Sequence, residues 1–205
     1  SLKLAEGLGD ATVSSLRKGY EENGVKQTKG FSEILKDFNH NDIEDLVAYM
    51  VSEGNLDYIK ANKQTGIRES DAQAMLKEYK DTKIDKASKE IRKINNYSLQ
   101  RLLQSGLITK EQIKSFKNIN EHYVPMNRVI DMEGKIGLNA KGLQNGKVIK
   151  GRKGSDRMII NPLESTVVNN MRIDRQIANN ENLKNLVDTL KQNDLLGEYI
   201  DEIPT

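Results

Sequence analysis

The sequence predicts a mainly α-helical protein: a helical bundle with a small antiparallel β-hairpin or extended arm inserted around residues 122–160. Three observations predict this class. Charged residues make up 30% of the 205 residues and aromatic residues only 5%, a composition that suits helices better than a β-sandwich. Apolar residues recur at helical spacing through the first 120 residues. Six glycines then fall within the 41 residues from His122 to Pro162.

These observations divide the chain into three parts of what we expect to be one domain. Residues 1–120 form a helical region, residues 121–160 an extended or hairpin element, and residues 161–205 a C-terminal helical region. The chain contains no Trp and no Cys. Its core must therefore consist mainly of Leu, Ile, Val and Met, and disulfides and thiolate metal sites are excluded. The chain opens with SLKLAEGLGD rather than with Met, which suggests a piece of a longer polypeptide or the remainder of a tag.

The helices of the first part are predicted from apolar stripes and capping residues. Residues 31–38 form a short helix with one apolar side. The next helix begins at Asn41, which has Glu44 as its capping-box partner, and ends at Gly54. Another helix begins at Ser70, with Gln73 in the capping-box position.

The most regular helix starts near Ile84. Its apolar or small positions follow a spacing close to a heptad: Ile84, Ala87, Ile91, Ile94, Ser98 and Leu102. Such a stripe could form an oligomerising coiled coil or pack inside the chain. We favour the second alternative, because the stripe lasts barely three heptads. Gly106 ends this helix, and Thr109 with Gln112 forms a capping box for the next one.

The pattern changes after residue 120. Short apolar pieces alternate with glycines, and Asn145–Gly146 is a typical hairpin turn. Pro125 lacks an N–H group, so it belongs on an edge or at the start of a strand. A helix resumes with Asn161 as N-cap, Pro162 in the first helical position and Glu164 three residues after the cap. The asparagine-rich segment 178–182 is a point where this last helix could bend or end.

Charge is unevenly distributed along the chain. Residues 1–60 carry 7 basic and 11 acidic side chains, residues 61–160 carry 21 and 11, and residues 161–205 carry 4 and 8. The net charges of the three parts are therefore −4, +10 and −4. A basic middle between acidic ends could face nucleic acid. Alternatively, the oppositely charged parts pack against each other, and the sequence leaves both alternatives open.

The densest group of cations is the candidate anion-binding site. It lies in residues 146–160 and consists of Lys147, Lys150, Arg152, Lys153 and Arg157. Gly151 and Gly154 would let backbone amides approach a phosphate. The segment lacks the ending of a P-loop and the context of a dinucleotide fold, so no cofactor is predicted. We slightly favour a solvated hairpin tip, because no aromatic residue interleaves with the cations to stack on bases.

The sequence contains no recognisable catalytic or metal-binding motif. Its two histidines, His40 and His122, have no metal-ligand spacing. A catalytic group of His122, Tyr123 and Arg128 is conceivable, but His122 and Tyr123 would point to opposite faces of an extended segment. We prefer a structural role in which Tyr123, Pro125 and Arg128 brace the junction between helix and extended chain. No catalytic residue is predicted.

Two stretches carry a resemblance to a known family: LLQSGLITKEQIKSFKNINEHYVPMNR and KGSDRMIINPLESTVVNN. They resemble the large polyvalent protein-associated domains of bacteriophages and mobile elements over roughly residues 99–180. The chain departs from the family pattern at Met126 and Asn127. The matching positions are Tyr123, Val124, Pro125, Arg128, Gly154, Ser155, Arg157, Pro162, Leu163 and Glu164.

The resemblance implies an accessory module of a long phage polypeptide, without an established reaction, in the virion or the host bacterial cytoplasm. The leading hypothesis is therefore a non-catalytic module that contacts nucleic acid or a partner protein through its basic middle, beside other domains of the parent polypeptide. One alternative is an oligomerising structural or virion-interior protein. Another is a phage enzyme with a site around His122, Tyr123 and Arg128. No membrane association is expected, because no apolar run approaches the ~20 residues that span a bilayer.

Overall fold

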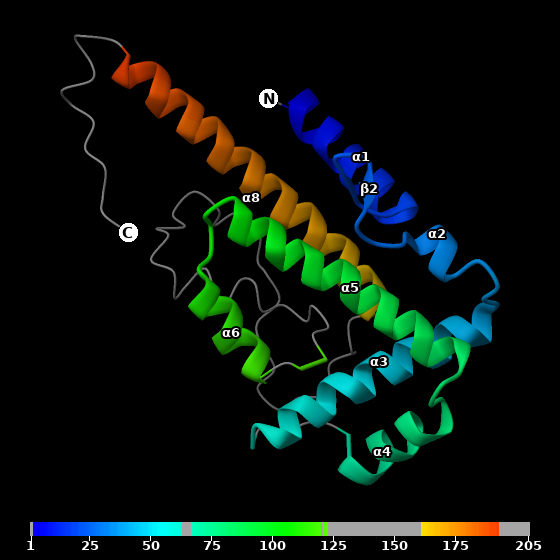
Figure 1. Ribbon diagram of the computed structural model, residues 1–205. Coiled ribbons are helices and arrows are strands. Elements are labelled where there is room, and N and C mark those ends of the chain that lie inside the picture. The colour runs from blue at the N-terminus through cyan, green and yellow to red at the C-terminus, as the bar shows by residue number, and fades with distance from the viewer. Residues whose placement is uncertain (1, 63–66, 120, 123–160, 193–205) are drawn as a thin grey trace.

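The computed structural model describes residues 2–62, 67–119, 121–122 and 161–192. These residues form seven helices and one two-stranded antiparallel hairpin (Figure 1). The predicted class, mainly helical with a small hairpin, is confirmed. The hairpin that the structure describes consists of β1 (Glu21–Glu22) and β2 (Val25–Lys26), in a region that the sequence predicted to be helical. Residues 123–160, where a hairpin was predicted, lie outside the described residues.

Helix α5 (Lys83–Gln104) is the central element of the bundle. Helix α8 (Pro162–Lys191) runs beside it in the same direction, and α1 (Leu2–Lys18) packs along α8 (Figure 1). Helix α3 (His40–Lys60) crosses the first half of α5, and α4 (Glu69–Glu78) packs on α3. The short α2 (Phe31–Ile34) and α6 (Lys110–Ile119) complete the arrangement.

All six stripe positions that the sequence assigned to α5 are buried. The apolar core forms three clusters around this helix. The first joins Leu46 and Met50 of α3 to Ile84, Ala87 and Ile91 of α5. The second contains Leu99, Leu102, Ile108, Phe116 and Ile173, and the third contains Leu16, Tyr20 and Ile94. Helices of the same chain therefore occupy the stripe, as the intramolecular alternative predicts.

Two predicted helix starts are confirmed in detail. Thr109 and Gln112 form the reciprocal capping box that starts α6, with N···O distances of 2.8 and 3.2 Å. The Asn161 side chain accepts a 2.9 Å hydrogen bond from the Leu163 N–H, and Pro162 follows the cap. These contacts satisfy backbone donors that have no partner inside the helix.

Other predicted boundaries are wrong by a few residues or more. Helix α3 is capped by Asn39 with Asp42, not by Asn41. It continues through Gly54 to Lys60, because the buried face around Gly54 outweighs the ~1 kcal/mol cost of a helical glycine. Helix α4 starts before Ser70, and its N-cap residue, Arg68, makes no side-chain capping bond. Helix α8 passes through residues 178–182 without a break.

The hairpin turn is made by Asn23 and Gly24, which both have positive φ angles, 51° and 75°. Two-residue hairpin turns of type I′ require this conformation at both central residues. At the base of the hairpin, the backbones of residues 17–19 and 28–30 touch. A Cβ atom on Gly30 would lie 2.2 Å from the Arg17 carbonyl oxygen, so this crossing depends on a residue without a side chain.

Candidate functional site

Most residues for which the sequence predicted a functional or structural role lie outside the described residues. These are the cations Lys147, Lys150, Arg152, Lys153 and Arg157 and the junction residues Tyr123, Pro125 and Arg128. Of the described ones, Asn161 and Pro162 start α8 and Glu164 is exposed in its first turn. His40 is exposed and lies 3.3 Å from Glu44 on the same helix. Among these candidates, His122 contacts a residue that is distant in the sequence, Asp57.

His122 is attached to a buried carboxylate on α3. Its backbone N–H donates to Asp57 Oδ2 at 2.5 Å, and its Nδ1 atom lies 2.8 Å from Asp57 Oδ1. Asp57 is only 4% exposed. The neighbouring Glu121 pairs with Lys60 at 3.3 Å. The chain just after α6 is thus held on the C-terminal end of α3.

One turn earlier on α3, a second buried carboxylate has a complete set of partners. Glu53 accepts a 2.6 Å hydrogen bond from Ser88 Oγ and forms a 2.9 Å ion pair with Arg92. Burial raises the pKa of Glu53, while Arg92 and Ser88 act in the opposite direction. Each oxygen of this carboxylate already has a protein partner, so the arrangement is that of a structural ion pair between α3 and α5.

Most cations of α5 are neutralised in the same way. Five of its six Lys and Arg residues pair with acids, three of them on α3 or α8: Lys83–Asp42, Lys89–Asp85, Arg92–Glu53, Lys93–Glu90 and Arg101–Asp174. This pairing agrees with the alternative in which oppositely charged parts of the chain pack together. It leaves much of the positive charge of α5 unavailable to an external partner.

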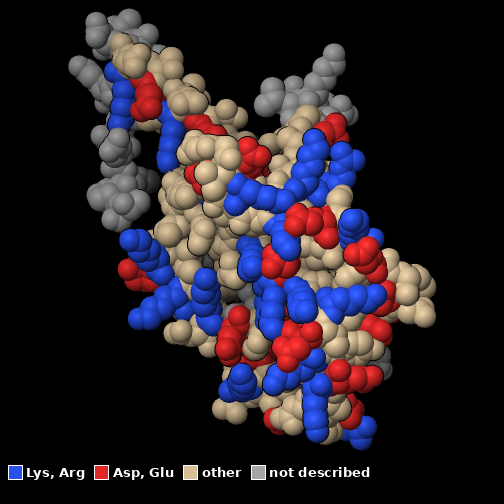
Figure 2. Space-filling model, turned by 45° about the vertical axis from the view of Figure 1, so that its right-hand side comes forward, with Lys and Arg blue, Asp and Glu red and all other residues tan. Residues whose placement is uncertain are grey.

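Helix α6 is different. Lys110, Lys114 and Lys117 lie four and three residues apart, so they share one side of the helix. All three are exposed. Within the described part of the chain, no acid forms an ion pair with them. In the space-filling view, the α6 side of the molecule carries a group of basic side chains with an acidic side chain among them, and acids and bases alternate over the rest of that face (Figure 2).

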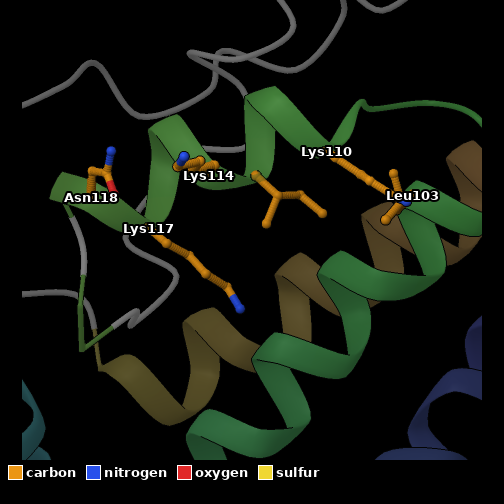
Figure 3. A pocket seen from close by; sticks show the side chains of 6 residues that line it. Leu103, Lys110, Lys114, Lys117 and Asn118 are labelled. Carbon is orange, nitrogen blue, oxygen red and sulfur yellow. The ribbon is translucent and has the colours of Figure 1, made fainter.

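These lysines border an open groove between α6 and the end of α5. The groove has a volume of ≈ 430 Å³ and is lined by Leu103, Lys110, Ile113, Lys114, Lys117 and Asn118. Leu103 and Ile113 are half-buried and pack on the second core cluster, so they give the groove an apolar floor. Lys117 extends into the space between the helices and Lys110 extends toward Leu103 (Figure 3).

The position of α6 follows from its sequence. Gly106 has a φ angle of +76°, which ends α5 and reverses the chain. Ile108 and Phe116 then anchor α6 in the core cluster of Leu102 and Ile173. The carbonyl oxygen of Ser105 accepts hydrogen bonds from Asn180 and Lys184 of α8. The two sides of the groove, α6 and the end of α5, are therefore both held in place by contacts with the core and with α8.

Sequence reasoning named residues 146–160 as the candidate anion-binding segment, with a solvated hairpin tip as the favoured alternative, and did not single out the α6 lysines. Their spacing was visible, but whether an acid in the described part of the chain pairs with them depends on the fold. The structure also brings Asp57, Glu121 and His122 together, with one potential ligand atom from each within 4.8 Å of the others. The sequence predicted no metal site, because its two histidines have no metal-ligand spacing and it contains no Cys. Asp57 is far from Glu121 and His122 in the chain, so only the fold brings the three together.

Comparison with protein-family models finds no match, and comparisons with curated proteins and with solved structures find no significant match either. The resemblance to polyvalent protein-associated domains therefore stays a hypothesis. Within the described residues, no helix combines the length and the apolar character needed to cross a membrane.

Proposed function

We propose that this chain is a non-catalytic docking module, whose α5–α6 groove binds an acidic amphipathic segment of a partner protein. The observation that carries this proposal is an apolar groove bordered by three lysines that no described acid neutralises. The groove lies within the basic middle of the chain. The resemblance to phage accessory domains supports a module that works beside other domains rather than one with a reaction of its own.

A helical protein segment fits the groove better than nucleic acid does. An amphipathic helix places its apolar face in such a groove and its flanking acids against the surrounding lysines. Phosphates would use the lysines but leave the floor of Leu103 and Ile113 without a partner. Among the described residues that line the groove, none has an aromatic side chain on which a base could stack.

The described titratable groups support the absence of catalysis. The buried carboxylates Glu53, Asp85 and Asp174 each pair with a cation, and Asp57 is bonded to His122. None of these acids lines the groove. A general acid or base has to reach a substrate, and these groups are engaged with one another.

The proposal can be tested with a labelled peptide. The probe is an 18-residue helix-forming peptide with Leu at i, i+3, i+4 and i+7 spacing and Glu on both flanks. Two control peptides carry Lys in place of Glu, or Ser in place of Leu. Fluorescence anisotropy at moderate salt measures binding to the full chain. We expect the acidic amphipathic peptide to bind and both controls to bind at least tenfold more weakly.

A charge-reversed protein identifies the surface. Lys110→Glu/Lys114→Glu/Lys117→Glu should weaken peptide binding by about tenfold or more, since each exposed pair contributes up to about 1 kcal/mol. The matched control is Lys77→Glu/Lys80→Glu/Lys86→Glu, with the same charge change on other elements, which should bind as the original protein does. Equal losses in both proteins, or retention of duplex or single-stranded oligonucleotides without peptide binding, would contradict the proposal.

A further inference from the structure

We propose that Asp57, Glu121 and His122 form a binding site for one divalent transition-metal ion. The site is distinct from the groove and needs no assumption about the docking partner. It joins the C-terminal end of α3 to the two residues that follow closely after α6. An ion there would fix the end of α6 on α3.

The donor set selects the class of ion. Two carboxylates and one imidazole suit zinc, manganese and related transition metals, whereas magnesium and calcium prefer oxygen ligands alone. One ligand atom from each residue already lies within 4.8 Å of the others. The two carboxylates offset the charge of a divalent cation, and the imidazole would bind in its neutral form.

The distance between Asp57 and His122 is close to that of two ligands on one ion. Asp57 Oδ1 and His122 Nδ1 are 2.8 Å apart. Two ligands with bonds of about 2.1 Å to one ion are separated by about 3 Å at right angles and by about 3.4 Å at the tetrahedral angle of zinc. A shift of a few tenths of an ångström therefore admits the ion. In the metal-bound neutral imidazole, Nδ1 holds the ion and the ring proton is on Nε2.

The other contacts keep one ligand fixed and leave another adjustable. Asp57 Oδ2 accepts the His122 backbone N–H at 2.5 Å, which holds the buried carboxylate in place in the way that outer contacts orient metal ligands. Glu121 is an exposed side chain whose partner, Lys60, is also exposed. Exchanging such a surface pair for a metal bond costs little, because it contributes at most about 1 kcal/mol.

The test is a titration of the full chain with ZnCl₂ or MnCl₂, followed by isothermal calorimetry. We expect one ion per chain, and MgCl₂ should bind at least a hundredfold more weakly. Glu121→Gln and His122→Ala should each weaken zinc binding by about tenfold or more. His40→Ala is the matched control, since it removes the other histidine, which lies beside Glu44.

Two readouts separate a lost ligand from a lost fold. Glu121 is exposed, so its replacement should leave the circular dichroism spectrum and the unfolding midpoint without metal unchanged. Saturating zinc should raise the midpoint of the original protein by several degrees and that of Glu121→Gln by much less. Failure to bind zinc at millimolar concentration, or a loss of binding in His40→Ala but not in His122→Ala, would overturn the proposal.

Discussion

Single residues decide several contacts in this protein, and Gly30 is the plainest case. A Cβ atom at this position would lie 2.2 Å from the Arg17 carbonyl oxygen and 2.4 Å from the Gly19 nitrogen. Both neighbours are backbone atoms, which cannot move aside as a flexible side chain does.

Gly30→Ala should therefore lower the free energy of unfolding by about 2–4 kcal/mol. Urea unfolding followed by circular dichroism measures the change. Gly7→Ala is the control: Gly7 lies in α1, and apart from the neighbouring backbone of its own helix an added Cβ would have no atom within 4 Å. It should stabilise the protein by up to about 1 kcal/mol. Similar effects at both positions would show that the backbone crossing is unimportant.

Asp85 is the residue whose pKa leads to a pH prediction. Its buried carboxylate accepts bonds from Tyr49 at 3.1 Å, Lys89 at 2.6 Å and the Asp81 N–H at 3.2 Å. Burial alone would raise its pKa, but these three donors outweigh that effect and hold the pKa below its usual value. A lowered folded-state pKa stabilises the protein above the unfolded-state pKa, and this stabilisation is lost as pH falls through the folded-state value.

Asp85→Asn should lower the free energy of unfolding by about 1–3 kcal/mol at neutral pH. The difference between the two proteins should shrink as pH falls below about 4, because the original carboxylate then becomes protonated. Urea unfolding of both proteins at a series of pH values measures this difference. A difference that stays constant down to about pH 3 would mean that the charge of Asp85 contributes nothing.

At the level of whole elements, the sequence predicted α5 best. Its stripe is regular, and each predicted position is buried because α3, α8 and neighbouring residues cover it. The starts of α6 and α8 were also predictable, since a capping box and an Asn-Pro pair are local signals. The end of α3 was not: a buried face continues past Gly54, and only the tertiary fold supplies the packing that outweighs a local signal.

The hairpin and the candidate site show two other limits. The Asn23–Gly24 turn was visible in the sequence, but its two-residue strands are exposed and have no alternating pattern. The α6 lysines were visible too. They differ from most cations of α5, which pair with acids that are often distant in the sequence, as Arg92 does with Glu53. Such pairs can be recognised only once the fold is known.

Helix α8 leads to an element-scale prediction, because its two halves differ. Ile173, in the first half, is fully buried in the second core cluster, whereas Leu183 and Leu186 are 60% and 53% exposed. Ile173→Ala should lower the free energy of unfolding by about 2–5 kcal/mol. Leu183→Gln/Leu186→Gln should change it by less than about 1 kcal/mol. A large loss in the second variant, measured by urea unfolding, would show that this half is covered in solution.

Over the whole molecule, one polar network joins the first and last described helices, α1 and α8, through α5. Arg101 of α5 forms a 2.5 Å ion pair with Asp174 of α8, and Thr12 of α1 lies 2.6 Å from the same carboxylate. The Arg101 guanidinium also sits 5.0 Å from the centre of the Tyr20 ring. The Tyr20 hydroxyl donates to Asn170, which is also bonded to Ser98, and burial raises the pKa of Tyr20.

Replacing both partners of such an ion pair by apolar residues changes the stability of a fold little. Removing only one partner destabilises the fold strongly, because the other charge stays buried without compensation. Arg101→Met should therefore lower the free energy of unfolding by about 3–5 kcal/mol, and Asp174→Leu should have a similar effect. The double variant Arg101→Met/Asp174→Leu should regain most of the loss. Urea unfolding of the four proteins forms a double-mutant cycle whose coupling energy reports the pair directly. Single losses that simply add in the double variant would mean that the two charges do not depend on each other, and that the Arg101–Asp174 pair does not couple α5 to α8.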